Sequence, residues 1–135
     1  MDEKFGKSYK LCSKIVIDSL FQNGIILKEF PFYFRFLFVE LQTTNSFQII
    51  VSAPKKKFKN ATDRNRIKRV IREIIRKNKN PIEEVLNKNY IQMALFINYS
   101  GNAKIEYYYA EEKILLLINR LIESIDKSKN FIHEK

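Results

Sequence analysis

Apolar and mixed residues alternate between Phe32 and Val39, and this two-residue period is that of a β-strand. Every even-numbered position from 32 to 38 is a phenylalanine, which is typical of a strand face in a protein core. The odd-numbered face includes Tyr33 and Arg35, and a guanidinium is costly to bury without a partner. The sequence therefore predicts a strand at residues 30–41, with one face in the core and the other bordering an open groove.

Helical spacing predicts three helices. The first follows Ser13, which can cap it, and stops at Asn23 before Gly24. The second is long, starts at a cap provided by Thr62 or Asp63, and carries one apolar stripe made of Ile67, Val70, Ile71, Ile74 and Ile75. The third has its apolar stripe within residues 108–125. We expect the two long helices to place these stripes against the core.

Shorter apolar runs complete the predicted fold. Residues 47–52 form a second strand, expected to pair with the first as a hairpin, and residues 90–99 form a central third strand. Residues 78–81, which include Pro81, end the long helix, and residues 82–87 form only a short helical turn.

The predicted order of elements is α-β-β-α-β-α. Three or four strands under two longer helices make a two-layer α+β sandwich. At 135 residues and 45% hydrophobic content, the chain is expected to form one domain, residues 1–135. An irregular arm at residues 1–12 and a frayed polar tail at residues 126–135 flank it.

Charge is concentrated in one segment. Residues 55–79 hold 12 Lys and Arg against Asp63 and Glu73, while the rest of the chain holds 13 basic and 13 acidic residues. The whole formal charge of +10 therefore belongs to this segment. A core-facing helix does not need its outer face filled with cations, which repel one another by a few tenths of a kcal/mol per pair. The pattern favours a phosphate-binding surface over an ordinary solvated face.

The residue inventory limits the chemistry of the protein itself. Cys12 is the one cysteine and His133 lies in the polar tail, so neither a Cys–His pair nor a His/Cys metal cluster is expected. The paired acids at 83–84 and 111–112 look like residues of a first helical turn. We therefore expect no catalytic residue and no metal site in the protein, and an intracellular, cytoplasmic chain without a membrane span.

The order of residues in the basic helix is more specific than its charge. It resembles the RNR signature of the bacterial ribonuclease P protein subunit, and it runs Arg64-Asn65-Arg66-Ile67-Lys68-Arg69, then Arg72. The lead-in resembles the same family, with Val51-Ser52, Lys55 to Lys57 and Asn60-Ala61. The resemblance extends from about Phe5 to Glu123 and is strongest from Val51 to Arg76.

This resemblance implies a fold, an activity and partners. The fold would be like the second domain of ribosomal protein S5, with a left-handed βαβ crossover where a right-handed one is the general default. The protein would assist a catalytic RNA subunit, which uses bound Mg²⁺, in removing the 5′ leader of precursor tRNA. The protein alone would be inactive and monomeric outside the holoenzyme.

The resemblance also implies two sets of site residues. The RNA-subunit contact would use Lys55, Lys56, Lys57, Lys59, Arg64, Asn65, Arg66, Lys68, Arg69, Arg72 and Arg76. A cleft for the single-stranded leader would use Phe5, Tyr9, Ile17, Phe21, Tyr33 and Arg35. The chain departs from the family where Ile17 replaces a usual Phe, Arg35 a frequent Tyr and Lys59 a frequent Gly. These departures bear mainly on stacking in the cleft.

Two other functions fit the same charge. A ribosomal or other structured-RNA-binding protein without a role in cleavage would carry a similar surface, and only the ordered motif argues against it. A DNA-binding protein could lay the basic helix in the major groove, but that would favour a dimer, and the sequence shows no dimer seam.

Overall fold

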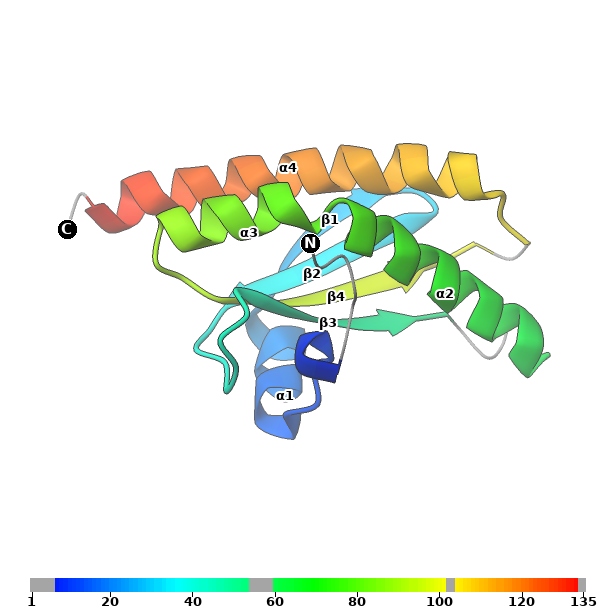
Figure 1. The fold of residues 1–135 in the computed structure, drawn as a ribbon, viewed down its shortest axis with the longest axis horizontal. Coiled ribbons are helices and arrows are strands. Elements are labelled where there is room, and N and C mark those ends of the chain that lie inside the picture. Colours follow the sequence, from blue (N-terminus) through cyan, green and yellow to red (C-terminus); the bar gives the residue numbers. More distant parts are fainter. Residues whose placement is uncertain (1–6, 54–59, 102–103, 134–135) are drawn as a thin grey trace.

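The computed structural model describes residues 7–53, 60–101 and 104–133. Its centre is a four-stranded sheet made of β1 (Ile25–Glu29), β2 (Phe32–Phe38), β3 (Phe47–Ser52) and β4 (Met93–Tyr99). The helices α2 (Ala61–Lys77), α3 (Lys79–Lys88) and α4 (Tyr107–His133) cover one face, and α1 (Lys14–Asn23) lies on the other (Figure 1). The sheet and the three helices form the predicted two-layer sandwich, with α1 packed below it.

The alternation along β2 confirms which of its faces is the core. Phe32, Phe34 and Phe36 are at most 1% exposed and pack in one cluster with apolar residues of α2, α3 and α4. The opposite face carries Tyr33 and Leu37, which pack in a second, smaller cluster with residues of α1. The sheet is thus buried on both faces, by different helices.

The sheet order is β1-β2-β4-β3, so the predicted hairpin between residues 30–41 and 47–52 is wrong. β2 instead forms its hairpin with β1, which the sequence did not predict, while β3 pairs in parallel with β4. The physical reason lies in β4, where every residue but Asn98 is buried. A strand this apolar belongs inside a sheet, with a neighbouring strand on each side, and β4 therefore lies between β2 and β3 and separates the two strands of the predicted hairpin. The loop before β3 is held by Gln92, which accepts from the Leu41 amide at 2.7 Å and donates to two loop carbonyls.

The first helix forms as predicted. Ser13 caps it by accepting from the Val16 amide, and the Gly24 amide donates to the Leu20 carbonyl at the other end. Leu20 is fully buried against the sheet. This contact fixes α1 against the face of the sheet that carries Arg35.

The long basic helix also forms, but its cap differs from the prediction. Asn60 caps α2, with its side chain accepting from the Thr62 amide at 2.8 Å, so the predicted caps Thr62 and Asp63 lie inside the first turn. The apolar stripe is confirmed, since the four isoleucines at 67, 71, 74 and 75 are at most 1% exposed. The helix therefore turns its cation-rich side away from the core.

Two boundaries extend further than expected. Residues 79–88 form a ten-residue helix rather than a short turn, because Pro81 is its third residue, where no intrahelical N–H bond is needed. The last helix continues to His133 through most of the predicted frayed tail. No glycine or proline lies between residues 107 and 133 to stop it.

Candidate RNA interface

The cationic side of α2 is the first part of the site. Its apolar stripe points into the core, so the remaining positions are left at the surface. Asn65, Arg66, Arg69 and Arg72 are exposed, and the half-buried members are Arg64, Lys68 and Arg76. These seven residues are the basic face of α2.

Arg66 and Arg76 are among the cations of the basic face that the protein itself holds. Arg76 forms a two-point ion pair with Glu73, with Nε 3.1 Å from Oε2, and this bond holds the pKa of the Glu73 carboxyl below its usual value. Arg66 donates from Nη1 to the Ile105 carbonyl at 3.2 Å, which ties α2 to the chain entering α4. Both residues therefore have a structural contact that the sequence did not indicate.

Three cations of the basic face have no such contact. Lys68, Arg69 and Arg72 make no hydrogen bond or ion pair with any residue that the structure describes. They stand on the surface as unneutralised charge, which is the arrangement that attracts phosphate. The predicted lysines at 55, 56, 57 and 59 lie outside the described residues.

The second part of the site lies between α1 and the lower face of the sheet. Arg35 of β2 donates from Nη1 to the Phe21 carbonyl at 3.0 Å, and its guanidinium carbon lies 5.3 Å from the centre of the Phe21 ring. Phe21 remains 43% exposed and meets Phe96 edge-on, with ring centres 4.8 Å apart. A cation and an accessible ring are thus held side by side.

Other predicted residues join this group, and we call the set of Ile17, Phe21, Tyr33, Arg35 and Phe96 the α1 cleft, after the leader cleft that the family resemblance implies. Tyr33 packs against Phe96, with ring centres 5.9 Å apart, and Ile17 is half-buried in the same cluster. Phe96 also lies on this face, where the two-residue period along β4 places it, although it was not among the predicted site residues. Gly24, predicted only as a helix stop, has a second role, because a Cβ there would lie 2.7 Å from Cγ of Arg35. Gly24 lets Arg35 reach under the end of α1.

Tyr9 is not part of the α1 cleft, so its predicted position is wrong. Its hydroxyl donates to Oε2 of Glu83 at 2.7 Å, and Nζ of Lys79 lies 4.8 Å from its ring centre. The chain before α1 runs along the outer edge of β3, where the Leu11 amide donates to the Ile49 carbonyl. This path turns Tyr9 toward α3 and Leu11 toward α1. The other predicted arm residue, Phe5, lies outside the described residues.

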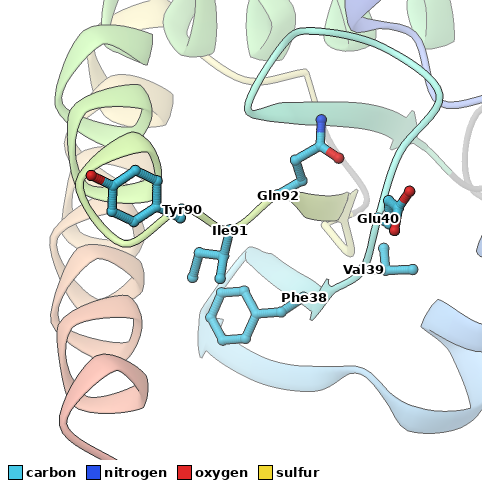
Figure 2. A pocket seen from close by; sticks show the side chains of 6 residues that line it. All are labelled: Phe38, Val39, Glu40, Tyr90, Ile91 and Gln92. Carbon is cyan, nitrogen blue, oxygen red and sulfur yellow. The ribbon is translucent and has the colours of Figure 1, made fainter. Parts of the chain in front are cut away.

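A pocket with a volume of 320 Å³ lies apart from these surfaces, where the chain leaves β2 and enters β4. Phe38, Ile91 and Glu40 are among its lining residues (Figure 2). Tyr90, at its edge, has φ 56° and a side chain that is 95% exposed. None of the predicted site residues lines this pocket.

The described part of the chain lacks two further features. It contains no group of three or more His, Cys, Asp or Glu side chains that could hold a metal ion. In the same residues, no helix combines the length and the apolar character needed to cross a membrane.

Comparison with known proteins identifies the family. A sequence model of the family described as Ribonuclease P matches residues 5–117. The chain belongs to the Ribonuclease P family. The Ribonuclease P protein component of Porphyromonas gingivalis (strain W83) is 31% identical over 85 residues, which are 63% of this chain and 62% of the relative. The aligned part of the chain thus spans less than two thirds of the length of this relative.

Solved structures of Ribonuclease P proteins have the same fold. The structure of Staphylococcus aureus RNase P protein superposes with a TM-score of 0.67 at 17% identity, covering 85% of this chain and 96% of that one. The RNase P protein from Thermotoga maritima gives 0.66 at 22% identity, with 82% and 96% covered. The α+β sandwich predicted from the sequence is therefore a Ribonuclease P protein fold.

Proposed function

We propose that this chain is the protein subunit of ribonuclease P, which binds the catalytic RNA subunit through the basic face of α2 and assists removal of the 5′ leader from precursor tRNA. The observation that carries the proposal is the row of Lys68, Arg69 and Arg72, which carry charge that no described residue neutralises. Phosphates are the partner that such a surface fits, because each neutralised phosphate releases a bound counterion.

The α1 cleft supports the second half of the proposal. Single-stranded RNA is bound by rings on which bases stack and by cations that follow the backbone. Phe21 supplies an accessible ring, and Arg35 supplies a guanidinium fixed beside it. In this proposal the cleft holds the leader while α2 holds the RNA subunit.

Catalysis in this proposal belongs to the RNA subunit with its bound Mg²⁺. The protein would act by bringing the leader to the RNA and by reducing the phosphate repulsion between the two. Highly purified, RNA-free protein is then expected to leave precursor tRNA intact. With its cognate RNA subunit, it should lower the Mg²⁺ concentration needed for cleavage.

The test is a crosslinking experiment in the native cell, followed by sequencing of the RNA attached to the protein. We expect enrichment of the ribonuclease P RNA and of precursor tRNA carrying its 5′ leader. A variant with Arg69→Ala and Arg72→Ala is the control, because it removes two exposed cations and no buried side chain. Enrichment of ribosomal RNA alone would assign the chain to the alternative class of structured-RNA binders.

A further inference from the structure

Three consecutive tyrosines begin α4, which packs against α2. Tyr107 is half-buried, whereas Tyr108 and Tyr109 are 73% and 44% exposed. An exposed tyrosine ring gains little by packing in the free protein, while it offers a rigid flat surface to a ligand. These rings belong neither to the α1 cleft nor to the basic face.

Tyr107 lies beside the last turn of α2, and Tyr108 packs against Tyr107. Nζ of Lys77, in the last turn of α2, lies 5.6 Å from the centre of the Tyr107 ring. The Tyr107 and Tyr108 rings meet edge to face, with centres 5.7 Å apart and planes at 86°. A cation, a supporting ring and an exposed ring therefore follow one another outward from α2.

The next tyrosine points to another side of α4. Arg120, which donates from Nη1 to the Lys28 carbonyl, marks the side of α4 that faces β1. Tyr109 is eleven residues before Arg120, and eleven residues return a helix to within about 20° of the same direction. Tyr109 therefore lies on the β1 side. Tyr108, about 100° away, lies nearer to α2.

The charge around the tyrosines differs from that of α2. Lys104 and Lys113 flank them, together with three carboxylates, those of Glu106, Glu111 and Glu112. This stretch has no positive excess with which to attract phosphate. An aromatic surface without excess positive charge, beside a cationic one, fits the face of a nucleobase whose own backbone phosphates rest on α2.

We propose that Tyr108, supported by Tyr107, stacks on one unpaired base of the RNA that is bound to the basic face of α2. The inference rests on the proposed function, which supplies that RNA, and it adds a contact that does not depend on charge. The occupant is argued from continuity. Arg66 of the basic face donates to the Ile105 carbonyl, just before α4, and Lys77 of the same helix lies over the Tyr107 ring on which Tyr108 packs, so the basic face adjoins the start of α4.

The experiment measures binding of the catalytic RNA subunit by Tyr108→Ala, Tyr108→Phe and Tyr109→Ala proteins across a range of salt concentrations. Stacking on a protein ring is lost with Tyr108→Ala, so we expect affinity to fall by about 5- to 150-fold. The slope of log K against log salt should stay unchanged, because no cation is removed. Tyr108→Phe, which keeps the ring, and Tyr109→Ala should both bind the RNA subunit with the affinity of the unmodified protein.

Chemical probing of the RNA gives a second readout. One unpaired base should be protected in complexes with the unmodified and Tyr108→Phe proteins and become reactive with Tyr108→Ala. Thermal unfolding of the free proteins should be unaltered, since 73% of the Tyr108 side chain is already in solvent.

The outcomes separate this inference from the proposed function. If Arg72→Ala lowers affinity and salt slope while Tyr108→Ala changes neither, the stacking contact is overturned and the RNA-subunit contact stands. If neither change affects binding, the proposed function itself fails. If Tyr108→Ala alters only self-association of the free protein in sedimentation experiments, the exposed ring contacts a second copy of the chain and the inference is overturned.

Discussion

Tyr90 adopts a left-handed backbone conformation, with φ 56°, at the end of α3. Two hydrogen bonds fix it there: the Tyr90 amide donates to the Asn87 carbonyl and the Ile91 amide to the Leu86 carbonyl, each at 3.1 Å. This is the pattern of a Schellman motif, in which glycine normally takes the left-handed position. The turn is thus set by backbone bonds, at the expense of strain in a residue that has a Cβ.

Tyr90→Gly is therefore expected to raise the free energy of unfolding by about 1 kcal/mol, because glycine adopts this conformation without strain. Little is lost with the side chain, which is 95% exposed. Urea denaturation measures the change. The matched control is Glu84→Gly, an exposed position in the middle of α3, which should lower stability by about 1 kcal/mol. A loss of stability in Tyr90→Gly would mean that the ring makes a contact that outweighs the strain.

The helix α2 has two different faces, one buried in the core and one exposed and cationic. Ile71 is fully buried, whereas its neighbour Arg72 is exposed and makes no hydrogen bond or ion pair with the described residues. Burial of the first stabilises the fold, and solvation of the second leaves charge available for RNA. A single helix thus joins the core to the proposed interface.

Substitutions on the two faces should separate stability from RNA binding. Ile71→Ala is expected to lower the free energy of unfolding by about 2–5 kcal/mol, because it opens a cavity in the core. Arg72→Ala should leave unfolding unchanged and reduce the salt slope of RNA binding by up to about one unit. Denaturant titration and salt-dependent binding are the two measurements. If Arg72→Ala lowered the stability of the fold while Ile71→Ala left it unchanged, the two faces of α2 would be assigned the wrong way round.

A contact between α3 and the segment before α1 links two further elements of the fold. Lys79 is only 6% exposed, and its Nζ lies over the Tyr9 ring and 3.3 Å from the Tyr9 hydroxyl. Glu83, one turn later, accepts from the same hydroxyl. Together these residues hold the segment that carries Leu11 along the edge of β3.

Tyr9→Ala should release this segment while the sheet stays folded, because it removes the ring and the hydroxyl that α3 holds. The Leu11 amide, which donates to the Ile49 carbonyl at 2.9 Å, is then expected to exchange its hydrogen faster. Hydrogen exchange followed by NMR measures this rate. In Tyr9→Phe, which keeps the ring and loses the hydroxyl, the exchange rate of the Leu11 amide should lie between those of the unmodified protein and Tyr9→Ala. Unchanged protection of Leu11 in Tyr9→Ala would show that the β3 edge holds the segment without Tyr9.

The whole molecule presents two separate surfaces. The helices α2 and α4 lie on one side of the sheet, and the α1 cleft lies on the other (Figure 1). Side chains of β2 face both sides, with Phe34 toward the large core and Tyr33 toward α1. A change in one surface can therefore be made without altering the other.

This separation makes a prediction for the assembled enzyme. If the α1 cleft holds the leader, Tyr33→Ala should reduce the preference for precursor tRNA over mature tRNA, since stacking on a ring contributes about 1–3 kcal/mol. Affinity for the RNA subunit should be unaffected. Binding of both tRNA forms to the reconstituted holoenzyme gives the preference. Equal losses for precursor and mature tRNA would remove the leader from the cleft and leave the α2 contact intact.

The sequence by itself determined the features that depend on local order. The two-residue period fixed the buried face of β2, the stripe from Ile67 to Ile75 fixed the buried face of α2, and the ordered cations after Arg64 indicated the family. Each of these signals repeats within one element, where backbone geometry alone decides which side chains share a face.

Tertiary structure decided which elements meet. Three contacts between different elements illustrate this: β3 pairs with β4, Tyr9 lies against α3, and Arg35 of β2 approaches Gly24 at the end of α1. The contact of Arg66 with the Ile105 carbonyl is of the same kind. No local pattern encodes such pairs. They depend on the position of the apolar strand β4 between β2 and β3, and on the path that the connecting segments take around it.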